Sequence, residues 1–469
     1  MRVVPTPKVI QTKNVPTTIP ATICTDFDCH MAVDSFIAYA TKIGIAFTLC
    51  EQGAICVRGD DSLPAGAYKL IVEPNGIVIL AKEARGVHYA FATLLQIMDA
   101  GEQKDKFTVP VCRIEDSGDC AYRGMMVDLA RVWHDFSYLL NYVDMCYFYK
   151  VGVLHLHFTD SQSYTLPSDL YPELPTKDRH YTKDQIATLV AYANARGIQL
   201  MPEIDVPGHC DAFGKAYPEI FNHEGIVPMH DAAMDFMRNL FGELCAFFPD
   251  STHIHIGGDE ADVTRWTRCA QCVQYGADRS LNTADEFLAH FVSEMAKVVF
   301  AAGKVPVVWE GFSKTVNGMV SKDILVMSWE NYYQTTPDLI DADFRVINCS
   351  WNPMYVVEPS FKWDPTDIYN WSIYRWIPVH PESPYKGQTL ELPPSSSVLG
   401  GQLLAWGDQI IVGYEDSFLG VLAERDALIA RLPYLAENTW NVQKRKSFTE
   451  LSILVEFLNN RLQLLLKRQ

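Results

Sequence analysis

Two adjacent carboxylates follow a pair of glycines in the segment 253–260, which reads His-Ile-His-Ile-Gly-Gly-Asp-Glu. On an extended strand, neighbouring side chains point to opposite faces, but Gly257 and Gly258 permit a turn that brings Asp259 and Glu260 into one site. Two carboxylates held close together separate their pKa values, so that one serves as an acid and the other stays ionised. The pattern predicts acid–base chemistry, and its alternative is a solvated acidic loop.

Two further clusters combine histidine with carboxylates. The first is 201–209, Met-Pro-Glu-Ile-Asp-Val-Pro-Gly-His, and the second is 155–164, His-Leu-His-Phe-Thr-Asp-Ser-Gln-Ser-Tyr. A carboxylate that orients an imidazole, which in turn contacts an acid, is a recurring way to set the pKa of that acid near working pH. We expect His155 and His157 themselves to point inward as buried core residues rather than to act as ligands.

Aromatic side chains stand at or just past the ends of four predicted strands: Trp309, Trp329, Tyr355 and Trp406. One such residue usually serves packing, but four at successive strand ends predict a walled pocket for a ligand with apolar faces, such as a sugar ring. Arg123, at the start of a predicted strand, and Asp408, just beyond Trp406, are candidates to bind hydroxyl groups at opposite sides of that ring.

The elements that must position these residues begin near Tyr122, where short β-rich runs alternate with longer helical ones. Two of the helical runs start with a capping box, at Thr182–Gln185 and Thr283–Glu286. The strands are predicted near 122–128, 151–158, 197–203, 252–257, 304–309, 323–328, 344–350 and 400–406. This α/β pattern predicts a (β/α)8 TIM barrel over residues 119–447, with its chemistry at the carboxyl ends of the strands.

The regions on either side of the barrel give shorter patterns. Within 1–118, the β-branched runs 68–73 and 76–81 are separated by a turn signal, and apolar residues at helical spacing follow from Val87 to Ala100. We therefore predict a small N-terminal α+β domain. The final stretch, 448–469, is predicted to be a helix packed on the barrel.

Composition limits the classes of partner. The 469 residues include 39 Lys and Arg against 57 Asp and Glu, a formal net charge of −18, which disfavours nucleic acid and anionic membranes as partners. No apolar run reaches the length of a membrane span, and the first residues lack the apolar stretch of a secretory signal. The 12 cysteines do not resemble the disulfide framework of a short secreted protein, and Cys269–Cys272 has only half of a zinc-site spacing. We expect a cytoplasmic location, although a chain trimmed of its signal would look the same.

Together these residues resemble glycoside hydrolase family 20, the β-N-acetylhexosaminidases. The resemblance extends from about Gly66 to Trp440, and the small domain before the barrel is similar to the one that precedes it in this family. Its motifs occur in family order: Tyr-Arg-Gly-Met-Met-Val-Asp at 122–128, His-Leu-His-Phe-Thr-Asp at 155–160, Pro-Glu-Ile-Asp-Val-Pro-Gly-His at 202–209, His-Ile-Gly-Gly-Asp-Glu at 255–260 and Gly-Gln-Leu-Leu-Ala-Trp at 401–406.

The resemblance implies an exo-acting retaining hydrolase that releases terminal β-linked N-acetylhexosamine from an oligosaccharide or glycoconjugate, without cofactor or metal. In this family the substrate's own 2-acetamido oxygen attacks C1 and forms an oxazolinium ion. The implied role of Asp259 is to hold the acetamido N–H and stabilise positive charge. Glu260 would protonate the leaving oxygen and then activate water, and Tyr355 would donate to the acetamido carbonyl.

The remaining roles are implied in the same way. His209 and Asp160 match the hydrogen-bonded residues that buffer the acid. Arg123 would bind the O3 and O4 edge of the sugar, and three tryptophans would enclose the sugar and its acetamido group: Trp309, Trp329 and Trp406.

The sequence departs from the family pattern in two places. Many members carry Asp two residues after the strand-seven Tyr, where this chain has Val357, with Glu358 beside it as a possible substitute. Many also carry Glu where this chain has Asp408. Both positions would face the O4 and O6 hydroxyls, so the preference between gluco and galacto sugars stays open, as does the oligomeric state.

Two other functions fit parts of the pattern. A metal-dependent hydrolase on the same barrel could use His155 with His157, or His253 with His255, as ligand pairs. It would explain neither the Gly-Gly-Asp-Glu turn nor the tryptophans. A sugar-binding module without catalysis would not need adjacent carboxylates beside a histidine and an aspartate.

Overall fold

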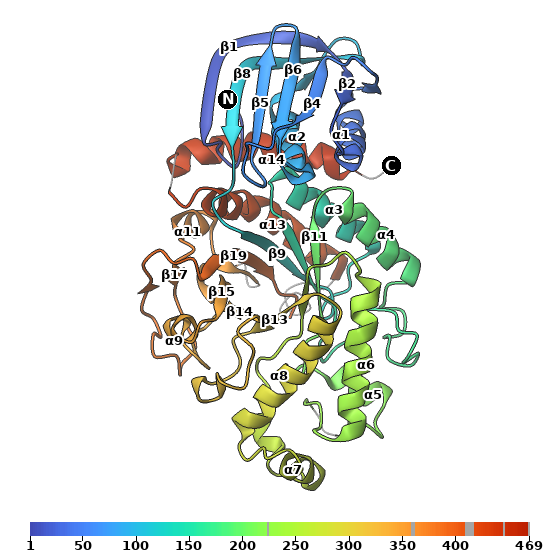
Figure 1. Cartoon of the computed structure of the whole chain (residues 1–469), viewed down its shortest axis with the longest axis vertical. Helices are drawn as coiled ribbons and strands as arrows, with labels where there is room; N and C mark the ends of the chain where they lie inside the picture. The colour runs from blue at the N-terminus through green and yellow to red at the C-terminus, as the bar shows by residue number, and fades with distance from the viewer. Residues whose placement is uncertain (223–224, 358–361, 409–416, 444–445, 468–469) are drawn as a thin grey trace.

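The computed structural model describes residues 1–222, 225–357, 362–408, 417–443 and 446–467. An N-terminal domain built on one mixed sheet lies against the end of a parallel barrel, as Figure 1 shows. Among the described residues, no helix is long and apolar enough to cross a membrane.

The N-terminal sheet has the strand order β1-β8-β5-β6-β4-β2-β3, with β7 on β8. Its strands are β1 (Val9–Pro20), β2 (Thr22–Thr25), β3 (Thr48–Leu49), β4 (Ile55–Gly59), β5 (Tyr68–Glu73), β6 (Gly76–Ala81), β7 (Asp99–Ala100) and β8 (Lys106–Asp116). The predicted turn joins β5 and β6 as an antiparallel pair, which confirms both predicted strands. Helices α1 (His30–Lys42) and α2 (Ala84–Ile97) pack on each other, and α2 also packs on β5 and β6. The predicted helix thus begins and ends three residues early, and the sequence patterns missed α1.

Eight parallel strands close into the predicted (β/α)8 barrel because β15, at one end of the strand order, pairs with β19. The barrel strands are β9 (Tyr122–Asp128), β10 (Val153–His157), β11 (Gln199–Glu203), β12 (His253–His255), β13 (Val305–Trp309), β14 (Leu325–Ser328), β15 (Arg345–Asn348) and β19 (Val398–Ala405). Each overlaps a predicted strand, so the predicted fold class is confirmed. Almost every strand residue is buried, as expected for a parallel sheet covered on both faces.

The helices of the barrel differ widely in length, from the four residues of α10 to the 24 residues of α13. Their bounds are α3 (Phe136–Phe148), α4 (Lys183–Asn194), α5 (Asp211–Ala216), α6 (Asp231–Phe247), α7 (Ala270–Ala277), α8 (Ala284–Ala301), α9 (Thr336–Asp341), α10 (Trp351–Met354), α11 (Pro365–Asn370) and α13 (Ser417–Trp440). Both predicted capping boxes are present, with Thr182 starting α4 and Thr283 starting α8. Between β14 and β19 the helices are short, with four to six residues each. The sequence predicted only a long loop over 358–395. The described part of this segment contains α11 and, in addition, an antiparallel pair of short strands, β17 (Arg375–Trp376) and β18 (Leu390–Glu391).

The N-terminal domain is attached near the amino-terminal end of β9. There the Lys150 ammonium and the Asp116 carboxylate form a buried ion pair of 3.1 Å. The C-terminal helix α14 (Phe448–Leu466) contacts α3 and α13 of the barrel, and its Arg461 also donates to the carbonyl oxygen of Leu95 in α2 at 3.0 Å. Helix α14 therefore joins the N-terminal domain to the barrel. Neither this helix nor the N-terminal domain covers the carboxyl ends of the barrel strands in Figure 1.

Candidate active site

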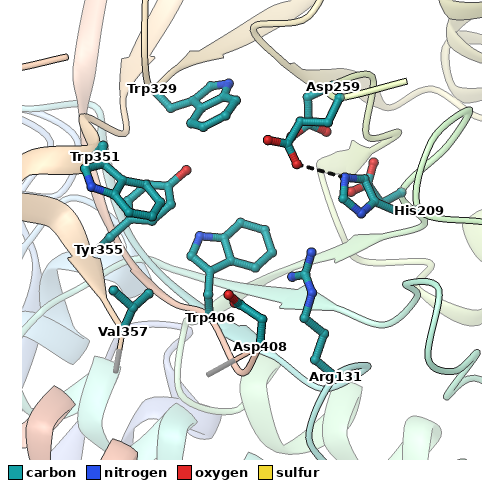
Figure 2. A pocket seen from close by; sticks show the side chains of 11 residues that line it. Arg131, His209, Asp259, Trp329, Trp351, Tyr355, Val357, Trp406 and Asp408 are labelled. Carbon is teal, nitrogen blue, oxygen red and sulfur yellow. Dashed lines mark ion pairs between the residues drawn. The ribbon is translucent and has the colours of Figure 1, made fainter. Parts of the chain in front are cut away.

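A cavity of about 250 Å³ lies at the carboxyl ends of the barrel strands. Its lining residues come from the segments that follow β9, β11, β12, β14, β15 and β19, and Figure 2 draws all of them and labels nine. They are Arg131, Asp205, His209, Asp259, Glu260, Trp329, Trp351, Tyr355, Val357, Trp406 and Asp408. The cavity thus lies at the end of the barrel where TIM-barrel chemistry is expected.

The turn after β12 places the two adjacent carboxylates as the glycine pair predicts. Gly257 and Gly258 have φ values of +72° and +114°, which L side chains rarely adopt. A Cβ at Gly257 would lie 2.0 Å from Oδ1 of Asp205, so glycine is also required there for space. The turn buries Asp259 and leaves the side chain of Glu260 53% exposed. The two carboxylates therefore have different environments and can take different roles.

Asp259 lies in an environment that disfavours its charge. Burial raises its pKa from 3.8 to about 7, with the positive charge of His209 opposing and the negative charge of Glu260 adding to the rise. Among the described residues, its Oδ1 is buried without a hydrogen-bond partner. A buried polar atom without a partner is costly, so this oxygen is suited to a donor on a bound ligand.

Asp205 is a second buried carboxyl group next to Asp259. Burial, and then the charge of Asp259, raise its pKa well above the usual range. Two such groups do not both ionise at neutral pH. The pair therefore holds one proton and one negative charge at neutral pH.

Glu260 belongs to a chain of alternating charges. Its Oε2 lies 3.4 Å from Nε2 of His209, and Nδ1 of His209 lies 3.4 Å from Oδ1 of Asp160. The hydrogen bond from His209 lowers the pKa of Glu260. The pKa of His209 is raised well above 6.5, because Asp205, Asp160 and Glu260 together outweigh burial. At rest the imidazolium therefore holds the proton beside an ionised Glu260.

The loop that carries His209 depends on another close approach. A Cβ at Gly208 would lie 2.9 Å from the carbonyl oxygen of Asp259. Because Gly208 has no side chain, the two loops pack backbone to backbone, and His209 reaches Glu260. The predicted association of His209, Asp160 and Glu260 is thus present in the structure. Asp160 itself is buried behind the cavity.

A buried polar cluster lies next to the charged series formed by Glu260, His209 and Asp160. Glu203 contacts three imidazoles, at 2.5 Å (His157 Nδ1), 2.8 Å (His255 Nδ1) and 3.1 Å (His155 Nε2). His157 also contacts Asp160 at 3.1 Å. Although burial opposes it, Glu203 and Asp160 raise the pKa of His157 well above 6.5, whereas burial lowers that of His155 to about 4. Both histidines are fully buried, which confirms the prediction that they point inward.

These groups also define where a metal ion could be held. Within the described residues, His155, Glu203 and His255 offer ligand atoms within 4.8 Å of one another, and so do His209, Asp259 and Glu260. In the first group, however, Glu203 already contacts both imidazoles, and its Oε1 also accepts from the indole N–H of Trp309 at 2.6 Å. The Glu203 carboxylate thus holds the two imidazoles of this group in place.

Aromatic rings form one wall of the cavity. The ring centroid of Tyr355 lies 4.3 Å from that of Trp351, 6.1 Å from that of Trp406 and 6.4 Å from that of Trp329. The Tyr355 hydroxyl points into the space between Trp329 and Trp406 (Figure 2). Burial raises the pKa of Tyr355 well above 10, so its hydroxyl is a neutral donor. Trp351, which the sequence patterns missed, lies just past β15, where strand-end residues are expected to reach the site.

Trp309 differs from the other predicted tryptophans. It is the last residue of β13, is 1% exposed, and does not line the cavity. Its ring lies 5.8 Å from that of Trp406, and its N–H is taken by Glu203. A residue within a barrel strand that points inward joins the packed interior, so Trp309 lies beneath the site rather than in its wall.

The structure corrects the assignment of Arg123. This residue is at the amino-terminal end of β9, and its guanidinium donates to the carbonyl oxygens of Lys150 and Cys120 and to the Tyr89 hydroxyl. It is therefore a buried structural group at the opposite end of the strand from the cavity. The prediction that Arg123 binds the sugar was wrong. Arg123 was chosen because it lies in a barrel strand, but it lies at the amino-terminal end of that strand, and the cavity is at the carboxyl end.

The arginine in the cavity is Arg131, three residues beyond the end of β9. It forms ion pairs with Asp128 at 3.1 Å and Asp160 at 2.7 Å, and its guanidinium lies 5.0 Å from the Trp406 ring centroid. Burial disfavours its charge, but Asp128, Asp160 and Asp408 raise its pKa above the usual range. The strand-end rule applied to the segment after Asp128 would have found it.

The two departures from the family pattern both fall at the cavity. Val357 and Asp408 line it, so one side of the site is apolar where a carboxylate was expected and the other keeps a carboxylate. Figure 2 shows Asp408 beside Arg131. Glu358, the possible substitute for the missing carboxylate, lies outside the described residues.

Comparison with known proteins places the chain in a family. The glycosyl hydrolase family 20 catalytic domain matches residues 120–442, and domain 2 of the same family matches residues 1–117. The chain belongs to glycosyl hydrolase family 20. This family 20 chain is 26% identical over 440 residues to a beta-hexosaminidase of Porphyromonas gingivalis, covering 85% of the chain and 54% of that protein. It is 33% identical over 279 residues to a beta-hexosaminidase of Akkermansia muciniphila, and this match covers 53% of the chain and 56% of that protein. The chain thus spans about half the length of these curated relatives.

Solved structures share the fold of this family 20 chain. A GH20 exo beta-N-acetylglucosaminidase from Vibrio harveyi, in complex with N-acetylglucosamine, superposes with a TM-score of 0.83 at 22% identity and covers 100% of this chain and 78% of its own. A beta-N-acetylhexosaminidase from Bacteroides fragilis superposes with a TM-score of 0.80 at 22% identity, and the match covers 98% of this chain and 95% of that one. At this identity the likeness establishes a common architecture.

Proposed function

We propose that this protein is an exo-acting β-N-acetylhexosaminidase, which removes terminal β-linked N-acetylhexosamine with retention of configuration. One observation carries the proposal. A buried Asp259 carboxylate with an unpartnered oxygen faces an aromatic cavity beside a half-exposed Glu260 that is backed by a charged imidazole. Family membership and the names of the relatives support the same activity.

The shape of the cavity favours a single terminal sugar over an internal one. Its volume of about 250 Å³ suits one pyranose ring with a short substituent. In Figure 2, Trp351 and Tyr355 lie on one side of the cavity and Asp259 lies on another, so that the described lining surrounds a space of that size. The substrate class is therefore an oligosaccharide or glycoconjugate that ends in N-acetylhexosamine.

The proposed mechanism uses the acetamido group of the substrate as the nucleophile. The ionised Asp259 accepts a hydrogen bond from the acetamido N–H and stabilises the positive charge that grows as the acetamido oxygen attacks C1. The neutral Tyr355 hydroxyl donates to the acetamido oxygen and orients it. Burial strengthens both interactions because little solvent competes with them.

Glu260 delivers the proton to the departing oxygen. At rest the proton resides on His209, and substrate that covers the half-exposed Glu260 disfavours its charge. The proton then moves across the 3.4 Å pair onto Glu260, and from there to the leaving group. After departure, Glu260 takes a proton from water, which attacks C1 and opens the oxazolinium ion. Arg131 and Asp408, which lie beside Trp406 in the lining (Figure 2), bind the hydroxyl groups of the sugar.

Paired aryl glycosides test the proposal directly. The rate constant kcat/KM is measured for aryl β-N-acetylglucosaminide, aryl β-N-acetylgalactosaminide and the plain aryl β-glucoside. We expect cleavage of at least one N-acetylated substrate and a loss of about 10³-fold or more for the glucoside, which lacks the nucleophile. Equal rates for glucoside and N-acetylglucosaminide would overturn the mechanism. The ratio of kcat/KM for the two N-acetylated substrates gives the gluco-to-galacto selectivity of a site lined by Val357 and Asp408.

The Glu260→Gln variant tests the acid separately. It keeps the shape of the side chain but has no proton to give, so a natural disaccharide loses rate strongly while an aryl glycoside with a good leaving group loses less. Equal losses on both substrates would contradict the role of Glu260. Ser161→Ala, which alters a half-buried residue next to Asp160 in the chain, provides a matched control for fold and expression.

A further inference from the structure

Three half-buried cysteines lie at one edge of the N-terminal sheet. Cys24 belongs to β2, Cys56 to β4, and Cys50 directly follows β3. Strands β4, β2 and β3 are consecutive neighbours at that edge. Of the other nine cysteines, eight are buried, so this cluster gathers most of the thiols that solvent can reach.

Two of the three are in direct contact. Cys24 and Cys56 are paired residues of the β2–β4 ladder, and their Sγ atoms lie 3.1 Å apart. Both sulfurs also face the carbonyl oxygen of Gly53, at 3.3 Å for Cys56 and 4.0 Å for Cys24. The Sγ of Cys50 instead faces the carbonyl oxygen of Ile23 at 3.8 Å. The strand pairing thus brings one specific pair of thiols together and leaves the third aside.

The pair is open to small molecules. Cys24 and Cys56 line a surface hollow of about 270 Å³ together with charged side chains that include Asp26, Glu51 and Arg58. Burial and the neighbouring Cys24 thiol raise the pKa of Cys56, while Arg58 lowers it. The short distance between the two sulfurs and the hollow beside them give a small disulfide access to the pair.

We propose that Cys24 and Cys56 form a redox-active dithiol, which a low-molecular-weight disulfide such as oxidised glutathione converts reversibly into a disulfide between β2 and β4. A thiolate of the pair attacks the oxidant, forms a mixed disulfide and releases one glutathione thiol. The second cysteine then attacks the mixed disulfide and releases the other. The two protein thiols lose two protons and two electrons, and the oxidant gains both as two glutathione thiols.

The bridge would enclose the segment 25–55, which contains α1. This helix joins the sheet to the barrel, since the Ser35 hydroxyl donates to the carbonyl oxygen of Ala195 at 2.5 Å and the Tyr39 hydroxyl donates to Asp144 at 2.5 Å. A cross-link that closes a loop restricts the unfolded chain. Oxidation therefore stabilises the folded N-terminal domain against unfolding, and the cavity lies at the other end of the barrel.

Peptide mapping of the full-length protein tests the proposal. The reduced protein is equilibrated in glutathione buffers of graded redox ratio, free thiols are blocked with N-ethylmaleimide, and the chain is digested with trypsin and a glutamyl endopeptidase. Cleavage after Glu51 separates Cys50 from Cys56. We expect a cross-linked peptide pair that joins Cys24 to Cys56, forms in one transition and disappears with dithiothreitol. The melting temperature should rise by about 2 °C or more with it.

Matched variants sharpen the test. Cys50→Ser changes a thiol of similar exposure on the adjacent strand and should leave both the cross-link and the rise in melting temperature intact. Cys56→Ser should remove both. The proposal is overturned if Cys24 and Cys56 stay reduced in fully oxidised glutathione, if each ends as a separate glutathione adduct, or if Cys50 replaces either partner. The map of the unmodified protein decides the question even if Cys56→Ser does not fold.

Discussion

Replacing His209 with alanine is expected to move the basic limb of the pH–rate profile toward lower pH. The pKa of His209 is raised, so the His209–Glu260 pair keeps its proton until the pH rises through that value. Without the imidazole, the last proton leaves Glu260 itself. Because the ordinary pKa of histidine lies about two units above that of glutamate, the limb moves down by about two units or more.

The geometry gives the size of the coupling that is lost. The charged atoms of His209 and Glu260 are 3.4 Å apart, and for a half-exposed pair with an effective dielectric constant of about 40 to 80 their attraction is about 1 to 2.5 kcal/mol. That is about one to two units in pKa. At neutral pH we therefore expect kcat/KM for a poor leaving group to fall about 100-fold, and to fall less for an aryl glycoside that needs little proton donation.

The assay follows kcat/KM from about pH 4 to about pH 9 for both substrates. His290→Ala is the matched control, because this half-buried histidine of α8 contacts Tyr275 of α7 and does not line the cavity. A lowered rate with an unmoved basic limb would refute the reasoning, and so would equal losses on the two substrates. Either result would mean that His209 only supports the loop.

Three other predictions concern the ends of the barrel, the buried carboxylate and metals. Arg131→Ala should raise KM by about tenfold or more through a lost charge-assisted contact, whereas Arg123→Ala should lower the melting temperature and leave KM in place; kinetics and calorimetry separate the two. Asp259→Asn should lower kcat by about 100-fold or more on both substrates. Since the Asp259 pKa is about 7 and its ionised form is required, kcat/KM of the unmodified protein should fall as the pH drops below about 7, and the variant should lose this acid limb. Activity should survive dialysis against EDTA; loss of activity that zinc restores would favour the metal-dependent alternative.

The barrel was predictable because parallel strands buried on both faces are short apolar runs, and turn residues or polar clusters end each one. The direction of the strands also predicted where the reactive groups lie, since Asp259, Glu260 and His209 all follow the carboxyl end of a strand. Gly257 is informative for a similar reason, because both its positive φ and the close approach of Asp205 require glycine there.

The errors have physical causes as well. Arg123 and Arg131 flank the same strand, and residue type alone does not tell which end faces the site. Trp309 was misplaced because the direction of the last side chain in a strand depends on the closure of the barrel. Helix α1 was missed because its contacts with Asp144 and Ala195 are distant in sequence, and such contacts leave no local pattern.

The position of the N-terminal domain has a practical consequence. Residue Met1 lies near Phe457 of α14, and both belong to the end of the molecule that is remote from the carboxyl ends of the barrel strands (Figure 1). Tethering the protein to a bead or an electrode through a tag before Met1 would therefore orient the mouth of the barrel outward. Diffusion of bulky glycoconjugates toward the immobilised protein would then meet no obstruction from the support.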